Sequence, residues 1–90
     1  MRFDILYNGI YPGYFCIRLN VEYGEYFHNE IKIYLKIPPH DYYNILFNSG
    51  GVFVEDYNNE NRYCFKSREE AQKAIDMLES YLIMNKLTEG

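Results

Sequence analysis

The clearest periodicity in the chain lies between residues 67 and 84, where apolar side chains recur at three- and four-residue steps. This spacing places them along one stripe of an α-helix, and that stripe must lie against an apolar layer. The stripe consists of Ala71, Ala74, Ile75, Leu78, Tyr81 and Leu82, with Met77 and Met84 beside it. Ser67 and Glu70 have the spacing of a capping box, so we expect the helix to begin there.

Alternation of apolar and polar residues predicts strands over residues 2–8, 14–22 and 30–37. In the third of these segments the apolar face consists of Ile31, Ile33, Leu35 and Ile37, and the polar face of Glu30, Lys32, Tyr34 and Lys36. We expect a connection over residues 23–29. Pro38 and Pro39 then end the third strand, since proline cannot donate to a strand ladder and suits the first position of a helix.

A short helix is expected over residues 40–48, with Tyr42, Ile45 and Leu46 on its apolar stripe and Ser49, Gly50 and Gly51 as its stop. Residues 52–57 and 62–66 read as a hairpin that leads into the long helix. The element order β-β-β-α-β-β-α favours a single α+β domain over residues 1–90. We expect a mainly antiparallel sheet of about five strands, with both helices covering one face.

A sheet covered on one side leaves its other face open to solvent, and the alternation assigns tyrosines and cations to that face. Aromatic and basic side chains together are typical of protein interfaces. The expected partner-binding residues of the open face are Tyr14, Arg18, Lys32, Tyr34 and Lys36.

Carboxylates gather at the end of the expected hairpin, at Glu55, Asp56 and Glu60. Their spacing does not match a calcium loop. They read either as a solvated hairpin tip or as an acidic patch that meets a basic surface on a partner, where complementary charge raises the association rate.

The chain shows little of the chemistry of an active site. His40 with Asp41 could form an acid–base couple, but their position after two prolines reads as an ordinary helix N-terminus. Cys16, Cys64, His28 and His40 lack the short paired spacings of a zinc site. We therefore expect no catalytic residues, no metal and no cofactor, and conclude that the chain is not an enzyme.

The composition of the chain narrows the class of molecule that it is expected to bind. The formal charge of -4 and the absence of Lys or Arg clusters disfavour direct nucleic-acid binding. Eleven tyrosines among 90 residues exceed what a small core can bury, so many are expected at the surface. The sequence has no signal peptide and no membrane-spanning run, which predicts a cytoplasmic protein whose cysteines stay reduced.

In this overall character, acidic, tyrosine-dense and without catalytic groups, the chain resembles the small phage-encoded inhibitors of the anti-CRISPR type. That resemblance implies an inhibitor that covers a basic nucleic-acid channel. An open sheet face with aromatics also resembles in outline the RNA-recognition fold, although its signature run is missing and the element order differs.

The leading hypothesis is thus a non-enzymatic protein-binding module, in its most concrete form an inhibitor of a nucleic-acid-processing complex. Two alternatives remain. One is a single-strand nucleic-acid-binding domain in which Tyr14 and Tyr34 stack on bases. The other is a self-associating structural subunit that pairs through a sheet edge or through Met77 and Met84.

Overall fold

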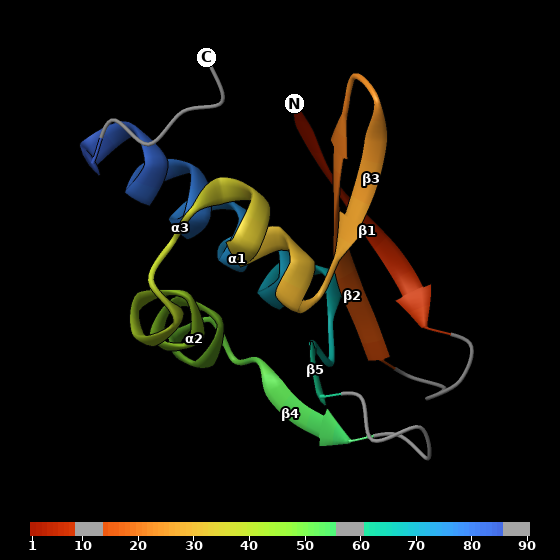
Figure 1. Cartoon of the computed structure of the whole chain (residues 1–90). Coiled ribbons are helices and arrows are strands. Elements are labelled where there is room, and N and C mark those ends of the chain that lie inside the picture. Colours follow the sequence, from red (N-terminus) through yellow and green to blue (C-terminus); the bar gives the residue numbers. More distant parts are fainter. Residues whose placement is uncertain (9–13, 56–60, 86–90) are drawn as a thin grey trace.

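The structure is a computed structural model, and it describes residues 1–8, 14–55 and 61–85 (Figure 1). Within these residues the chain forms five strands and three helices, which confirms the α+β class. In chain order the elements are β1 (Arg2–Asn8), β2 (Tyr14–Val21), β3 (Gly24–Phe27), α1 (Asn29–Leu35), α2 (Pro39–Asn48), β4 (Val52–Glu55), β5 (Asn61–Cys64) and α3 (Arg68–Asn85).

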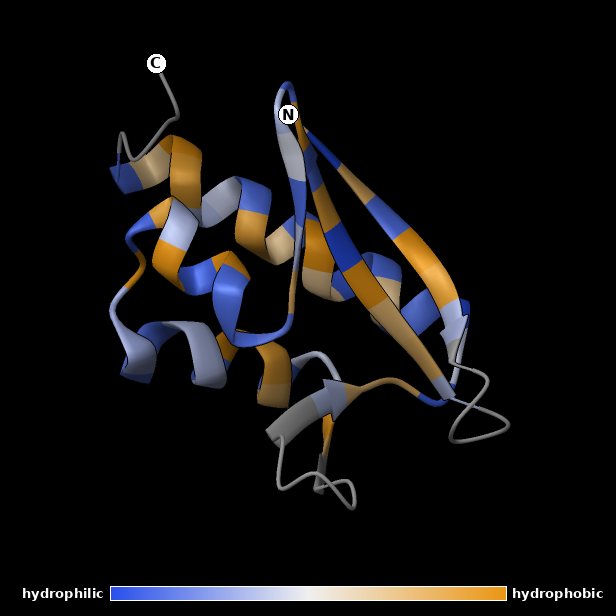
Figure 2. Ribbon diagram, turned by 45° about the vertical axis from the view of Figure 1, so that its right-hand side comes forward, coloured by the Kyte–Doolittle hydropathy of each residue, from blue (hydrophilic) through white to orange (hydrophobic). Residues whose placement is uncertain are grey.

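The main sheet is antiparallel in the order β1-β2-β3. Hydrophobic and hydrophilic residues alternate along β1 and β2 (Figure 2), so that one face of the sheet is apolar. Ile5 lies opposite Ile17 on this apolar face, and Asp4 lies opposite Arg18 on the other face. The three helices lie on one side of the sheet (Figure 1).

The core lies between the apolar sheet face and the helices. Its largest fully buried side chains are Tyr42, Phe65, Leu19, Ile31, Leu78 and Cys64. Every member of the predicted stripe of α3 is buried except Tyr81, which is half-buried. The long helix is therefore confirmed, and the apolar layer that its stripe was predicted to meet includes β1 and β2.

A second sheet is the hairpin of β4 and β5, which confirms the predicted hairpin with shorter strands. Among the described residues, one isolated bridge joins it to the main sheet, where the backbone N–H groups of Phe15 and Phe65 each donate to the other residue's carbonyl, at 2.6 and 2.7 Å. The predicted single sheet is thus a three-stranded sheet and a two-stranded sheet that meet at one residue pair.

The prediction of a strand over residues 30–37 is wrong, because this segment is the helix α1. Ile31 and Leu35, one helical turn apart, are buried, whereas Ile33 is 69% exposed. A short segment rich in β-branched residues fits both periods, and the surrounding fold decides between them. The third strand is β3, which follows β2 after a two-residue turn in the segment predicted as a connection.

Two non-glycine residues with positive φ bound α1. His28 has φ 52° before the helix, and Lys36 has φ 58° in the left-handed region after it. The Tyr42 hydroxyl of α2 donates to the His28 carbonyl oxygen at 3.0 Å, and burial raises the pKa of this phenol. The turn into α1 is therefore held from inside the core by α2.

The ends of α2 and α3 follow the predicted signals. Pro39 occupies the first turn of α2, and after the helix Gly50 takes φ 93°, a conformation that glycine adopts without strain. The Glu70 backbone N–H donates to the Ser67 hydroxyl at 3.2 Å, as the capping box predicts. The Glu70 carboxylate accepts from the same hydroxyl at 3.2 Å, rather than from the Ser67 N–H that the motif predicts.

Candidate functional site

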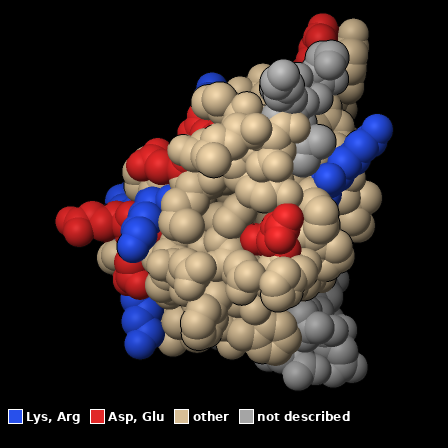
Figure 3. All heavy atoms as spheres, turned by 90° about the vertical axis from the view of Figure 1, so that its left-hand side faces the viewer, with Lys and Arg blue, Asp and Glu red and all other residues tan. Residues whose placement is uncertain are grey.

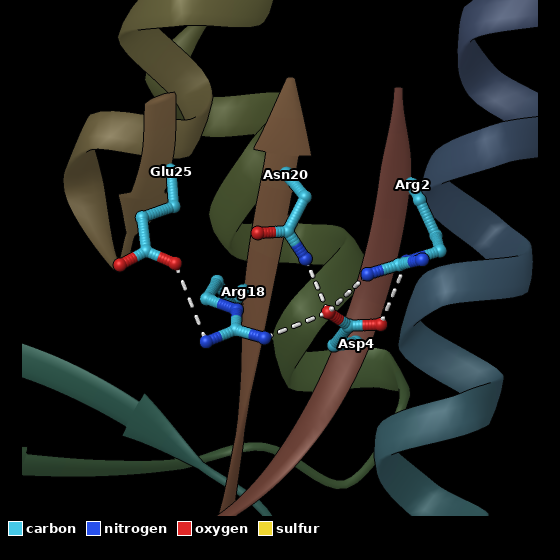
Figure 4. A network of polar contacts seen from close by, with 5 residues as sticks. All are labelled: Arg2, Asp4, Arg18, Asn20 and Glu25. Carbon is cyan, nitrogen blue, oxygen red and sulfur yellow. Dashed lines mark hydrogen bonds and ion pairs between the residues drawn. The ribbon is translucent and has the colours of Figure 1, made fainter. Parts of the chain in front are cut away.

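The face of the main sheet opposite the helices carries a polar network that crosses all three strands (Figure 4). An Asp4 oxygen of β1 accepts from Arg18 at 2.9 Å and also from the Asn20 amide, both on β2. Arg2 pairs with the other Asp4 oxygen at 3.1 Å. Arg18 reaches Glu25 of β3 at 3.3 Å with its second terminal nitrogen. The charges on this face therefore bind one another.

These contacts shift the ionisation of both central groups. The hydrogen bond from Arg18, with smaller contributions from Arg2, holds the pKa of Asp4 below its usual value. The same bond, with the charge of Glu25, raises the pKa of Arg18. A partner molecule that recruited Arg18 would have to replace its bonds to two carboxylates, so the network acts mainly between the strands.

The structure separates the residues that the sequence assigned to the open sheet face. Tyr14 and Arg18 lie there, on β2, where Tyr14 is half-buried. The placement of Lys32, Tyr34 and Lys36 on the same face is wrong, because α1 is a helix on the opposite side of the sheet.

Each of these three residues has a structural contact of its own. Tyr34 stacks on Tyr26 of β3 with ring centroids 4.5 Å apart. The Lys32 ammonium lies 5.5 Å from the centroid of the Tyr43 ring. Lys36 forms the left-handed end of α1. The two tyrosines proposed to stack on bases, Tyr14 and Tyr34, therefore do not share a surface.

Most of the predicted acidic hairpin tip lies outside the residues that the structure describes. Glu55 is the last residue of β4, and Asp56 and Glu60 lie outside the described residues. The proposed couple of His40 and Asp41 is divided between different contacts. His40 lies 3.2 Å from the Asn44 amide, and Asp41 accepts a hydrogen bond from Tyr81. In the described ranges, no three His, Cys, Asp or Glu side chains gather as metal ligands would.

An open apolar groove with a volume of about 340 Å³ lies between α2 and α3. We call it the α2–α3 groove. Ile45 lines it from α2, and the other lining residues, all from α3, are Lys73, Asp76, Met77, Ser80, Tyr81 and Met84. Figure 3 shows the left-hand side of the molecule in Figure 1, where uncharged residues cover most of the surface, one acidic group lies near the centre and the other charged groups lie toward the edge.

The sequence of α3 explains why the groove is open. Residues 73, 76, 77, 80, 81 and 84 follow one helical stripe beside the buried stripe. Ser80, in the middle of that stripe, has a short side chain, whereas Met77 and Met84 on either side are long and flexible. Met84 is 81% exposed. An apolar side chain with so much surface in water is available for burial by another molecule.

A hydrogen bond fixes one wall of the groove. The Tyr81 hydroxyl donates to the Asp41 carboxylate at 2.7 Å, and this bond ties α3 to the first turn of α2. The bond to the carboxylate, together with partial desolvation, raises the pKa of Tyr81. The wall thus keeps its position as long as the phenol stays protonated.

Sequence reasoning named the apolar members of the groove but did not find the groove, and it missed Lys73, Asp76 and Ser80. It placed Met77 and Met84 beside the buried stripe and Ile45 on the stripe of the short helix, but the helix pairing that brings them together is a tertiary property. The exposed apolar residues at spacings of three and four beside an already sufficient core stripe were the available signal.

No described helix combines the length and the apolar character that crossing a membrane requires. Comparisons of this chain with models of protein families, with curated protein sequences and with solved structures find no match.

Proposed function

We propose that this chain is a non-enzymatic protein-binding module that accepts an amphipathic helix of another protein in the α2–α3 groove. The observation that carries this proposal is the apolar lining of the groove, in particular Met77 and the largely exposed Met84. Helix-in-groove recognition buries apolar anchors at helical spacing, and methionine adapts to their shapes.

Charge defines the partner further. Asp76 lies in the groove and Asp41 binds its Tyr81 wall, against a single cation, Lys73, among the described lining residues. The whole chain has a formal charge of -4. A partner helix with basic residues beside its apolar face is therefore complementary, because opposite charge steers association and suppresses acidic competitors.

An inhibitor of a nucleic-acid-processing complex is the most concrete version of this function. Proteins that bind nucleic acid present basic surfaces, because neutralising phosphates requires lysine and arginine. An acidic module with an apolar groove is suited to such a surface. In this version the anti-CRISPR resemblance describes the type of target, and the groove supplies the contact.

The test uses two synthetic helical peptides with the same leucine face, one flanked by lysines and the other by glutamates. The protein is labelled at its methionine methyl groups, and its three methionines are Met1, Met77 and Met84. Met77 and Met84 line the groove, whereas Met1 precedes β1 and serves as an internal control. We expect the lysine peptide to shift the Met77 and Met84 signals and to leave Met1 unchanged.

Three results would contradict the proposal. The first is that neither groove methyl shifts with the lysine peptide. The second is that Met1 shifts as much as Met84, and the third is that the glutamate peptide binds equally well. Light scattering on the protein alone tests whether a second copy of the chain fills the groove. A dimer that Met84→Lys converts to a monomer would assign the groove to that second copy and contradict the proposal.

A further inference from the structure

The backbone bridge between β2 and β5 sets two cysteines opposite each other. Phe15 and Phe65 exchange both of their backbone hydrogen bonds, which makes them a hydrogen-bonded pair of antiparallel strands. One step along each strand from this pair lie Cys16 and Cys64. Extending the register of this isolated bridge by one residue on each strand pairs Cys16 with Cys64.

A second observation brackets the cysteines from the other side. Ile17 and Tyr63, one step further, both line the same small cavity of about 10 Å³. Side chains alternate along a strand, so these two residues share the core face with Phe15 and Phe65, and both cysteines point to the opposite face. Figure 1 shows β5 beside β2.

Residues opposite each other next to a hydrogen-bonded pair have Cα atoms roughly 4.5 Å apart in regular sheets. A disulfide requires Cα atoms between about 4.4 and 6.8 Å apart. Both cysteines are thiols in the structure. If the register of the bridge is extended by one residue, the pair falls within the range that a disulfide requires.

The surroundings make Cys16 the more reactive thiol. Cys64 is completely buried, whereas Cys16 keeps 8% of its surface exposed. Arg18 follows two residues later on the same face of β2. Its pKa is raised chiefly by the hydrogen bond to Asp4, with smaller contributions from Glu25 and from the charge of Cys16. A neighbouring guanidinium favours the thiolate, which is the form that reacts.

We propose that Cys16 and Cys64 are a thiol pair that closes reversibly into a disulfide between β2 and β5 when the protein meets a small oxidised disulfide. The Cys16 thiolate attacks one sulfur of oxidised glutathione and releases one glutathione thiolate. The Cys64 thiolate then attacks the Cys16 sulfur of the mixed disulfide and releases the second glutathione. The two protein thiols lose two protons and two electrons, and the glutathione disulfide is reduced to two thiols.

The bond would lock the β4–β5 hairpin to the main sheet. In the described residues, one isolated backbone bridge joins these two sheets. The disulfide would also close a loop from residue 16 to residue 64 that includes α1 and α2. A loop of this length gives a disulfide a large effect on the unfolded chain, and we expect oxidation to raise the Tm by on the order of 10 °C. In a reducing compartment the pair stays open, as the sequence predicts.

The experiment incubates the folded protein with excess oxidised glutathione and measures its intact mass. Wild type should become lighter by about 2 Da, the mass of two hydrogens, and should carry no glutathione. Cys64→Ala should instead retain one glutathione on Cys16, because the resolving thiol is missing. Cys16→Ala should keep its unmodified mass and carry little or no glutathione, because Cys64 is buried.

Three outcomes would overturn the proposal. The first is that wild type keeps both thiols while Cys64→Ala forms its adduct. The second is that wild type accumulates the mixed disulfide without forming the Cys16–Cys64 bond, and the third is that it forms disulfide-linked dimers. Thermal unfolding of the oxidised wild type gives a further readout, and a Tm equal to that of the reduced protein would likewise contradict a bond between β2 and β5.

Discussion

The open face of the main sheet and the α2–α3 groove differ in how their side chains are satisfied. On the sheet face, Arg18 binds Asp4 and Glu25, so the charges of neighbouring strands serve as each other's partners. In the groove, Met77 and Met84 contribute apolar surface that remains accessible, and the Tyr81–Asp41 bond holds the wall beside them.

This difference indicates which surface supplies binding energy. Surface ion pairs contribute little, and a partner that recruited Arg18 would first have to break its bonds to Asp4 and Glu25. Apolar surface gains free energy simply by leaving water, in proportion to the area buried. The sheet network therefore holds strands together, whereas the groove is the surface suited to a partner.

The largest expected effect is a loss of binding when a charge enters the groove. Met84→Lys places an ammonium among the lining residues and should weaken binding of the lysine-flanked peptide by on the order of 30-fold, the size of an interface hot spot. Isothermal titration calorimetry measures this affinity. Stability should change little, because Met84 is exposed.

Ile83→Lys is the matched control for this variant. Ile83 is 75% exposed and adjacent in sequence, but it is not among the lining residues of the groove. The substitution adds the same charge to the same helix. Equal losses for the two variants would mean that net charge, rather than the groove, controls the affinity.

The next effect is a gain in stability at a residue that the sequence assigned to binding. Lys36 has φ 58° at the end of α1, a conformation that glycine adopts more readily. Lys36→Gly should raise the free energy of unfolding by about 1 kcal/mol, measured by urea denaturation. Peptide affinity should be unchanged, and a large loss of affinity would return Lys36 to the binding surface.

A smaller effect is expected at the groove wall. Tyr81→Phe removes the hydroxyl that donates to Asp41 and leaves the ring in place. The peptide affinity should fall a few-fold, because the wall loses its fixed position. The hydroxyl bond also predicts that the wall of wild type, unlike that of this variant, shifts as pH rises through the raised pKa of Tyr81, which the Met77 and Met84 methyl signals of the free protein report. Identical affinities and pH profiles would show that the bond does not shape the groove.

The smallest effect concerns the sheet network at low pH. The pKa of Asp4 is lowered by Arg18, so its contribution to stability is present above the unfolded-state value of about 4 and is lost as pH falls through the lower folded value. Asp4→Asn should therefore be less stable than wild type at neutral pH, and the gap should narrow below about pH 4. Denaturant unfolding at several pH values measures it, and a constant gap would contradict the ion pair.

The elements predicted best from sequence were those whose period had only one interpretation. The stripe of α3 spans five turns and fits only a helix, and β1 and β2 alternate for seven and eight residues. The segment of α1 has only seven residues, and its isoleucines satisfy both periods. Its fate depends on β3, which occupies the place beside β2 that the predicted third strand would have taken.

For the candidate sites, the sequence could predict only which residues share one face of a strand. Arg18 was correctly placed on the uncovered face of β2, but its bonds to Asp4 and Glu25 depend on the pairing of three strands. The bounds of α1 were harder still, since positive φ at His28 and Lys36 is unusual for these residue types. The groove required knowledge of which helices are neighbours, which single-chain periodicity does not contain.

The most direct test of the account is to identify which protein protons contact the bound lysine-flanked peptide, by isotope-edited nuclear Overhauser spectroscopy. The account predicts contacts from the peptide leucine methyls to Met77, Met84 and Ile45 in the α2–α3 groove. Contacts to Leu6 and Tyr14 on the open sheet face, with none to Met84, would contradict it.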